Sequence, residues 1–262
     1  MGVSTIDKTY KTSEVAKIIG IHPNTVRMYE DLELISKPIR KANGYRVFTE
    51  LHIYQFKLAR KVFEVEVLQN GLRKKAIAIV KMSAKQDFDS AIILTKQYIE
   101  AIKKEIDNAN EAVDIAEKLI NGLNQEKEFN LKRKEVSELL GISMDTLRNW
   151  EMNGLVKIKR KENGYRIYTY EDIQRLKVIR SLKCGNYSLS AILRMLNKLS
   201  EHNEADINEV LNSPNENEDI ISVCDRLIIS LNLAIKNAEE ILEMLYEMKR
   251  KYLNTPLNWN IT

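Results

Sequence analysis

The chain has few of the residues on which disulfide, metal and membrane proteins depend. Its 262 residues include two cysteines, Cys184 and Cys224, which give neither a disulfide framework nor a paired metal spacing. No apolar run approaches the roughly 18 residues that span a bilayer, and the N-terminus lacks the apolar core of a signal peptide. We therefore expect a chain of the reducing cytoplasm that does not enter a membrane.

The sequence also offers no candidate for catalysis. His22, His52 and His202 form no cluster with ligand spacing, and no glycine-rich phosphate loop is present. No nucleophile, base or paired carboxylate recurs in a pattern that suggests a reaction. The sequence therefore predicts no enzyme activity, no catalytic residue, no cofactor and no bound metal.

What the chain does have is basic charge in two segments. The first head (residues 8–63) carries 11 Lys and Arg against 5 Asp and Glu, and the second head (residues 130–183) carries 13 against 7. Each head thus has a net charge of +6, and because the whole chain has +4 the remainder carries −8. This asymmetry points both heads towards a polyanion.

The two basic segments are copies of one another. Residues 10–53 and 130–173 share identical residues at a shift of 121, and the run Asn-Gly-Tyr-Arg at 43–46 returns at 163–166 with a shift of 120. The residues that recur at the first shift are Glu14, Val15, Gly20, Ile21, Thr25, Arg27, Glu30 and Leu34. Such agreement over 44 positions indicates a duplicated domain.

Each copy predicts two short helices followed by a hairpin. In the first copy, Thr12-Ser13-Glu14 opens a helix that Gly20 closes, and Pro23 precedes a second helix over residues 24–31. In the second copy, Ser143 suits the cap of the equivalent second helix. An Asn-Gly pair between alternating segments then predicts a two-stranded hairpin, or wing, in each head.

The order of these elements carries a family resemblance. Three motifs stand in this order in each head: TVRMYE, LIS-P-R and GYRVFT in the first, and TLRNWE, GLV and GYRIYT in the second. They resemble the DNA-binding domain of the MerR family of winged-helix transcription regulators. The resemblance covers both heads closely and the rest more loosely. It implies that Arg27 and Arg148 contact the DNA backbone, although each could instead pair only with Glu30 or Glu151. Metal sensors of the family carry cysteines beside the end of their coiled-coil helix, where this chain has none.

The residues expected at a DNA interface lie on the first and second helices and on the wing of each head. The wing arginines suit phosphates or a minor groove. Tyr29 and Trp150 suit either the edge of the core or a place beside a phosphate, and Lys132 suits either solvent or a phosphate. The full set is Thr12, Asn24, Thr25, Arg27, Tyr29, Arg40, Lys41, Tyr45, Arg46, Lys132, Asp145, Thr146, Arg148, Trp150, Arg160, Lys161, Tyr165 and Arg166.

Two long helices are expected outside the heads. Apolar residues recur in steps of three and four along residues 87–121, and again at a shift of 129 along residues 219–252. The MerR family pairs two identical chains through an antiparallel coiled coil of this kind. We infer that here one chain supplies both halves as a pseudo-dimer, with exchange of halves between two chains as the alternative. The expected interface residues are Ile92, Ile99, Ile102, Ile106, Val113, Ile221, Cys224, Ile228, Leu231, Ile235, Leu242 and Leu245.

The expected fold is mainly α with small β-hairpin wings, in which two winged helix-turn-helix domains are joined by a long antiparallel coiled coil. No motif over residues 64–72 matches the connection at 186–190, which resembles the family's entry into a supporting helix. The expected segments are a first domain 8–86, a first coiled-coil helix 87–121, a linker 122–129, a second domain 130–200, an acidic loop 201–218, a second coiled-coil helix 219–252 and a tail 253–262.

The resemblance and the charge together imply a sequence-specific, double-stranded DNA-binding transcription regulator. RNA polymerase would be an indirect partner, and promoter DNA would be distorted, as in the family. Because residues 22–26 differ from residues 143–147, we expect an operator with two unlike half-sites. The alternative is an architectural, excisionase-like DNA-bending protein, or a protein that docks partners through its acidic part.

Overall fold

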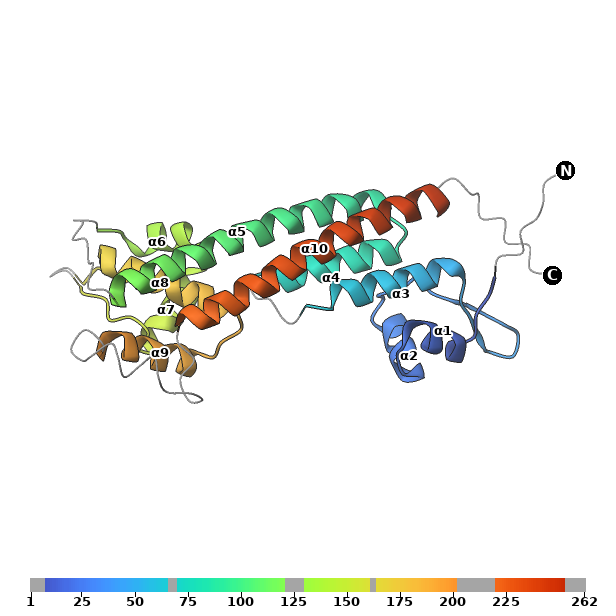
Figure 1. Ribbon diagram of the computed structural model, residues 1–262, viewed down its shortest axis with the longest axis horizontal. Helices are drawn as coiled ribbons and strands as arrows, with labels where there is room; N and C mark the ends of the chain where they lie inside the picture. Colours follow the sequence, from blue (N-terminus) through green and yellow to red (C-terminus); the bar gives the residue numbers. More distant parts are fainter. Residues whose placement is uncertain (1–7, 66–69, 121–129, 161–163, 202–219, 253–262) are drawn as a thin grey trace. The chain divides into compact units, whose positions relative to one another are not determined.

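The structure, a computed structural model, falls into two compact units (Figure 1). The first unit comprises Met1–Glu66, Gly71–Ile102 and Leu233–Thr262, and the second comprises Val67–Asn70 and Lys103–Asn232. Within the described part of the chain, no helix is long and apolar enough to cross a membrane. The residues that the structure describes are 8–65, 70–120, 130–160, 164–201 and 220–252. The expected linker and tail, Lys161 and the acidic loop beyond Glu201 lie outside these ranges.

The first head begins with two short helices whose ends follow local signals. The elements in order are α1 (Thr12–Ile19), α2 (Pro23–Asp31), β1 (Ile39–Arg40), β2 (Arg46–Val47), α3 (Glu50–Val62) and α4 (Leu72–Ala84). Gly20 ends α1 in the left-handed region at φ 72°, and Pro23 occupies the first turn of α2. The cap of α1 lies at Lys11, one residue before the expected start, and its backbone N–H donates to the Glu14 carboxylate at 2.6 Å. Helix α4 stands in the region where no motif predicted a supporting helix.

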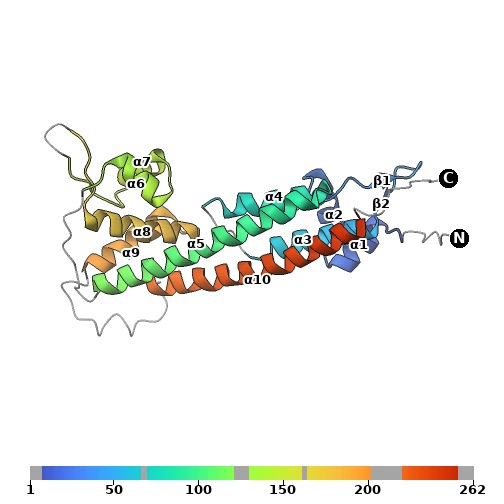
Figure 2. The ribbon, with the colours of Figure 1, turned by 90° about the horizontal axis from the view of Figure 1, so that it is seen from above.

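The first wing is an antiparallel hairpin that projects from its own head (Figure 2). Ile39 lies opposite Val47 and Arg40 lies opposite Arg46. The turn forms at the Asn-Gly pair, where Gly44 adopts φ 80°, a value that a side chain would disfavour. This register brings both wing arginines onto the same face of the hairpin.

The second head repeats this order. Its helices are α6 (Arg133–Leu140), α7 (Met144–Met152), α8 (Tyr170–Cys184) and α9 (Leu189–Glu201). Ser143 caps α7 as expected, because its Oγ accepts the Thr146 N–H at 3.0 Å. In the described part of the second wing, Arg160 and Arg166 form an isolated antiparallel bridge. The expected fold class, mainly α with winged helix-turn-helix heads, is confirmed.

The long helices α5 (Phe88–Ile120) and α10 (Ile220–Tyr252) run antiparallel within each unit. In the first unit, Lys249 of α10 pairs with Asp89 of α5, and the Lys96 ammonium lies 6.0 Å from the Tyr246 ring centroid. In the second unit, Ala112 and Ala116 of α5 share one core cluster with Val223 and Cys224 of α10. The start of each helix therefore packs beside the end of the other.

On both long helices, several of the expected interface residues are only half-buried, and the residue one position earlier is buried in their place. On α5, Ile92 and Ile102 are buried as expected, but Ile99, Ile106 and Val113 are half-buried. The row beside them, one residue earlier, is the buried one and consists of Tyr98, Glu105 and Ala112. On α10, Cys224, Leu231 and Leu245 are buried, Ile228, Ile235 and Leu242 are half-buried, and the Ile221 side chain is outside the description.

Corresponding glutamate and asparagine residues of the long helices attach each head to the long helix of the other copy. In the first unit, Lys61 of α3 pairs with Glu240 of α10 at 2.9 Å, and Asn237 donates to the Lys61 carbonyl at 3.4 Å. In the second unit, Lys177 of α8 pairs with Glu111 of α5 at 2.5 Å, and the Ser181 hydroxyl donates to the Asn108 carbonyl at 3.0 Å. Glu240 and Asn237 stand 129 residues after Glu111 and Asn108, which is the shift of the long helices. Each long helix packs against a head as well as against the other long helix. Its buried face therefore differs from the face that the apolar repeat alone predicts.

A buried histidine makes the first unit sensitive to acid. Burial lowers the pKa of His52 to about 4, so the folded chain keeps the imidazole neutral while the unfolded chain protonates it below about 6.5. The unfolded state therefore binds more protons between pH 6.5 and 4, and the stability of this unit falls as the pH drops through that range. We expect His52→Gln to lessen this loss by about 3 kcal/mol at pH 4. Unfolding midpoints measured from pH 7 to 4 would check this, and parallel curves for the two proteins would contradict it.

Candidate nucleic-acid interface

Helix α2 divides into a buried face and a polar, exposed face. Val26 and Tyr29 are buried in the head, and Tyr29 stacks on Phe56 with ring centroids 5.3 Å apart. Asn24 and Arg27 are exposed, and the Arg27 guanidinium donates to the Asn24 Oδ1 at 2.9 Å. The exposed face of α2 thus carries a fixed pair of an amide and a guanidinium, with Thr25 half-buried beside it.

Helix α7 repeats this division with different residues. Leu147 and Trp150 are buried, whereas Asp145 and Arg148 are exposed and Thr146 is half-buried. Tyr29 and Trp150 were expected either at the edge of the core or beside a phosphate. In the structure both are core residues. Where α2 presents Asn24, α7 presents Asp145, so the two faces differ in hydrogen-bonding character.

Each wing is fastened to the helix beside it by an arginine and a glutamate. Glu30 of α2 accepts from Arg40 at 3.2 Å and from Arg46 at a shorter distance. In the second head, both oxygens of Glu151 accept from the Arg166 Nε at 2.7 Å. These bonds raise the pKa of the Arg166 guanidinium.

The two carboxylates thus bind wing arginines and are not the partners of Arg27 and Arg148. The sequence did not indicate this role for Glu30 and Glu151, although both recur at the same shift as the neighbouring residues. Arg133 is a second residue that sequence reasoning missed, because its guanidinium donates to the Met144 carbonyl at 3.0 Å. It ties the start of α6 to the start of α7.

The tips of both wings carry exposed tyrosines beside cations. Tyr45 is 72% exposed and Tyr165 is 73% exposed, while Lys41 and Arg160 are also exposed. A tyrosine with this exposure presents a planar aromatic ring and a hydroxyl, and it suits packing against a sugar or a base edge. Thr12 is half-buried in α1, and Lys132 is exposed at the cap of α6.

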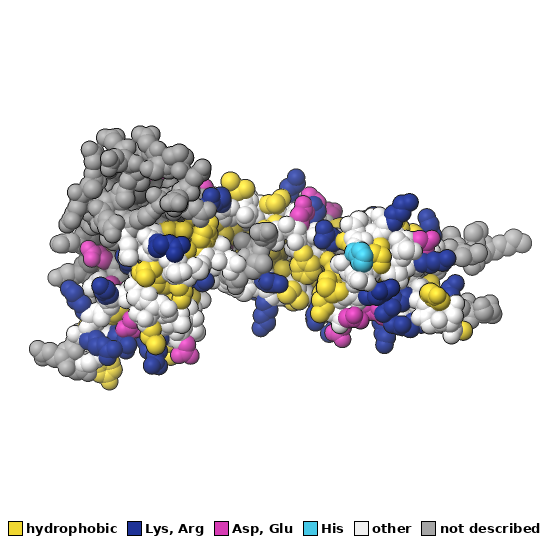
Figure 3. Space-filling model, turned by 90° about the horizontal axis from the view of Figure 1, so that it is seen from below, with side chains coloured by type: hydrophobic (Ala, Val, Ile, Leu, Met, Phe, Trp, Pro, Cys, Tyr) yellow, Lys and Arg dark blue, Asp and Glu magenta, His cyan; other side chains and the backbone are white. Residues whose placement is uncertain are grey.

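Lys and Arg side chains gather over both heads on the face that Figure 3 shows. Over the first head they surround α1, α2 and the hairpin, with a few acidic side chains among them. Clustered cations of this kind attract the phosphate backbone of DNA irrespective of its sequence. The charge counted along the sequence is therefore displayed at the surface.

The described part of the chain contains no group of three or more His, Cys, Asp or Glu placed to hold a metal ion. Both cysteines are buried and neither is part of a disulfide. Burial raises the pKa of the Cys184 thiol to about 12, which keeps it protonated and unreactive at neutral pH.

These features define the class of each head. A short helix, a tight turn, a second helix with a polar exposed face and a wing held against that helix form a winged helix-turn-helix domain. In this class the second helix enters the major groove of duplex DNA.

Comparison with known proteins names the family of both regions. Residues 11–48 match the model described as MerR family regulatory protein, and residues 131–199 match the model described as MerR HTH family regulatory protein. The chain therefore carries two MerR-type domains, one in each half.

The curated relatives match over a shorter stretch. HTH-type transcriptional regulator CueR of Escherichia coli O157:H7 is 40% identical over 53 residues, which are 20% of this chain and 39% of that protein. CueR of Salmonella typhimurium is 38% identical over 53 residues, and HTH-type transcriptional regulator ZntR of Escherichia coli K12 is 35% identical over 63 residues, 24% of this chain and 45% of that protein. The chain thus spans less than half the length of the relatives it matches. No solved structure matches the chain.

Proposed function

We propose that this chain is a sequence-specific, double-stranded DNA-binding regulator of transcription. The observation that carries the proposal is the shared construction of the heads. Each exposes an arginine on the second helix, Arg27 or Arg148, and each fastens its wing to that helix through a glutamate, Glu30 or Glu151. The helix–wing pair is thus one preorganised surface, which limits the ordering cost of binding a duplex. The relatives named as HTH-type transcriptional regulators support the same function.

The proposal includes an internal pseudo-dimer. A family that pairs two identical chains needs two copies of the head and of the long helix, and this chain contains both copies. The ion pairs Lys61–Glu240 and Lys177–Glu111 use corresponding glutamates of the two long helices, and they support attachment of each head to the other copy's helix within one chain. Analytical ultracentrifugation with a labelled DNA duplex tests this: one chain per duplex is expected, and two chains per duplex would favour exchange of halves.

The proposed operator has two unlike half-sites and is distorted on binding. Asparagine suits adenine and aspartate suits cytosine in the major groove, so Asn24 and Asp145 favour different base pairs. Selection of bound sequences from random DNA, followed by footprinting, is the direct test. A well-matched inverted repeat would contradict the unlike half-sites, and an unbent duplex in a circular-permutation assay would contradict the distortion.

Arg148→Ala is expected to weaken binding to all sequences by a similar factor. An exposed arginine that neutralises one phosphate contributes through counterion release, so its loss should reduce the slope of log affinity against log salt by about 0.9. Binding isotherms at several salt concentrations measure this. Arg194→Ala is the matched control, because Arg194 is an exposed arginine of another helix, α9, in the same unit. Equal slopes for Arg148→Ala and Arg194→Ala would contradict the assigned phosphate contact.

A further inference from the structure

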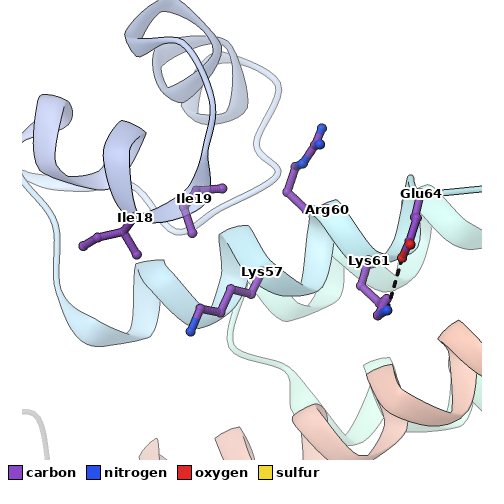
Figure 4. Close-up of a pocket in the computed structure, with 6 residues that line it drawn as sticks. All are labelled: Ile18, Ile19, Lys57, Arg60, Lys61 and Glu64. Carbon is purple, nitrogen blue, oxygen red and sulfur yellow. Dashed lines mark ion pairs between the residues drawn. The ribbon is translucent and has the colours of Figure 1, made fainter.

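A pocket of about 380 Å³ opens in the first unit between α1 and α3 (Figure 4). Ile18 and Ile19 of α1 form one wall, and Lys57, Arg60, Lys61 and Glu64 form the other. Its volume is within the range of small-molecule sites. The pocket joins an apolar wall to a cationic one.

Two of its cations are available to a ligand and one is not. Lys61 binds Glu64 at 3.1 Å and Glu240 at 2.9 Å, so its charge is already matched. Lys57 and Arg60 are exposed, and within the described ranges neither has a carboxylate at ion-pair distance. They stand three residues apart on α3, and in Figure 4 their side chains point to different sides of that helix. Ile18, opposite them, is 47% exposed.

In the second copy, the position that corresponds to this pocket is occupied by an arginine and a carboxylate of the chain itself. Arg180 stands 120 residues after Arg60 and is buried. Its guanidinium donates to both oxygens of Glu105 at 2.7 and 2.8 Å, and its Nε donates to the Leu140 carbonyl at 2.7 Å. Leu140 is the counterpart of Ile19 at the repeat shift of 121. The second head therefore contains a built carboxylate site at the position of the pocket.

The first copy has the arginine but not the carboxylate. Ala234 occupies the place of Glu105 at the long-helix shift of 129. Glu64, the counterpart of Cys184, binds Lys61 and Asn237 and leaves Arg60 exposed. An arginine whose twin binds a carboxylate bidentately thus faces an open space with apolar residues beside it.

We propose that this pocket binds a small organic carboxylate with an apolar body. Its carboxylate binds the Arg60 guanidinium in the manner of Glu105 on Arg180, with Lys57 adding a second positive charge. The apolar body covers Ile18 and Ile19. A bound ligand braces α1 against α3 and so acts on the helix-turn-helix of the first head. The site is independent of the proposed DNA binding and is tested without DNA.

The test uses the full chain and a panel of ligands at constant ionic strength. Calorimetry is run with benzoate, phenylacetate and hexanoate, with their neutral amides, and with acetate and inorganic phosphate. We expect saturable binding, one ligand per chain, for carboxylates that have an apolar body. The amides should lose the guanidinium contact, and acetate and phosphate should lose the apolar contact.

Variants locate the site. Arg60→Gln should weaken the best carboxylate by about tenfold, the loss expected for one charge-assisted contact. Arg73→Gln is the matched control, because Arg73 is an exposed arginine of α4 in the same unit that does not line the pocket, and it should stay within about twofold of the parent. Lack of saturable binding by every carboxylate, equal binding of phosphate, or equal effects of the two variants would each overturn the proposal.

Discussion

Glu105→Ala is expected to destabilise the second unit by about 3–5 kcal/mol. The side chains of Glu105 and Arg180 are 7% and 11% exposed, and the substitution leaves the Arg180 guanidinium without its two carboxylate acceptors. Asn70 and Asn108 also lose an acceptor, at 3.3 and 3.4 Å. A buried cation without a partner costs far more than the net value of the pair, because it has already lost its water.

Urea unfolding followed by Trp150 fluorescence measures this change, in a Trp259→Phe background that leaves one tryptophan in the second core. Glu111→Ala is the matched control on the same helix: its carboxylate is 46% exposed in its pair with Lys177, and its loss should cost at most about 1 kcal/mol. The double variant Glu105→Leu with Arg180→Met should recover much of the stability, since no charge is then left buried. Similar costs for Glu105→Ala and Glu111→Ala would contradict the account.

The same pair shows why the sequence predicted the long helices well and their buried face less well. Helix α5 begins at Phe88, one residue after the expected start, and the described residues 220–252 are helical as the apolar repeat indicates, because periodicity is a local signal. Glu105 and Asn237 do not belong to the apolar repeat, because polar residues on a helix usually face solvent. They are buried because a head packs onto that side of the helix, which is a contact between residues far apart in sequence.

The parts of the candidate interface that short sequence signals determine, namely the helix starts and the wing turn, were predictable. Ser143 and Pro23 mark the starts of α7 and α2, and the wing turn forms at Asn43-Gly44. The partners of the wing arginines were not predictable, since Arg46 meets Glu30 across 16 residues of turn and hairpin. The signal that could have found them was the recurrence of both members in the two copies. Because the chain is duplicated, each copy can be compared with the other. This comparison shows that Arg60 lacks the carboxylate that its counterpart Arg180 binds.

Transferring the exposed face of α2 onto α7 should change the preferred operator. The variant carries Ser143→His, Met144→Pro, Asp145→Asn and Asn149→Met, which gives the cap and first two turns of the second helix the outward residues of the first. Leu147 stays, because it is fully buried. Each mismatched base pair costs about 1–3 kcal/mol, so two changed positions should shift the preference between half-sites by about 100-fold or more. The selected DNA should become an inverted repeat of the first half-site.

Selection from random DNA, followed by affinities on paired duplexes, measures this change. Leu147→Val alone is the matched control, because it alters the core side of α7 to the residue of α2 and leaves the exposed face unchanged. It should keep the unlike half-sites of the parent. If the four-residue transfer also keeps them, specificity does not lie in these helices, and the sequence preference must come from the wings or from the deformability of the DNA between them.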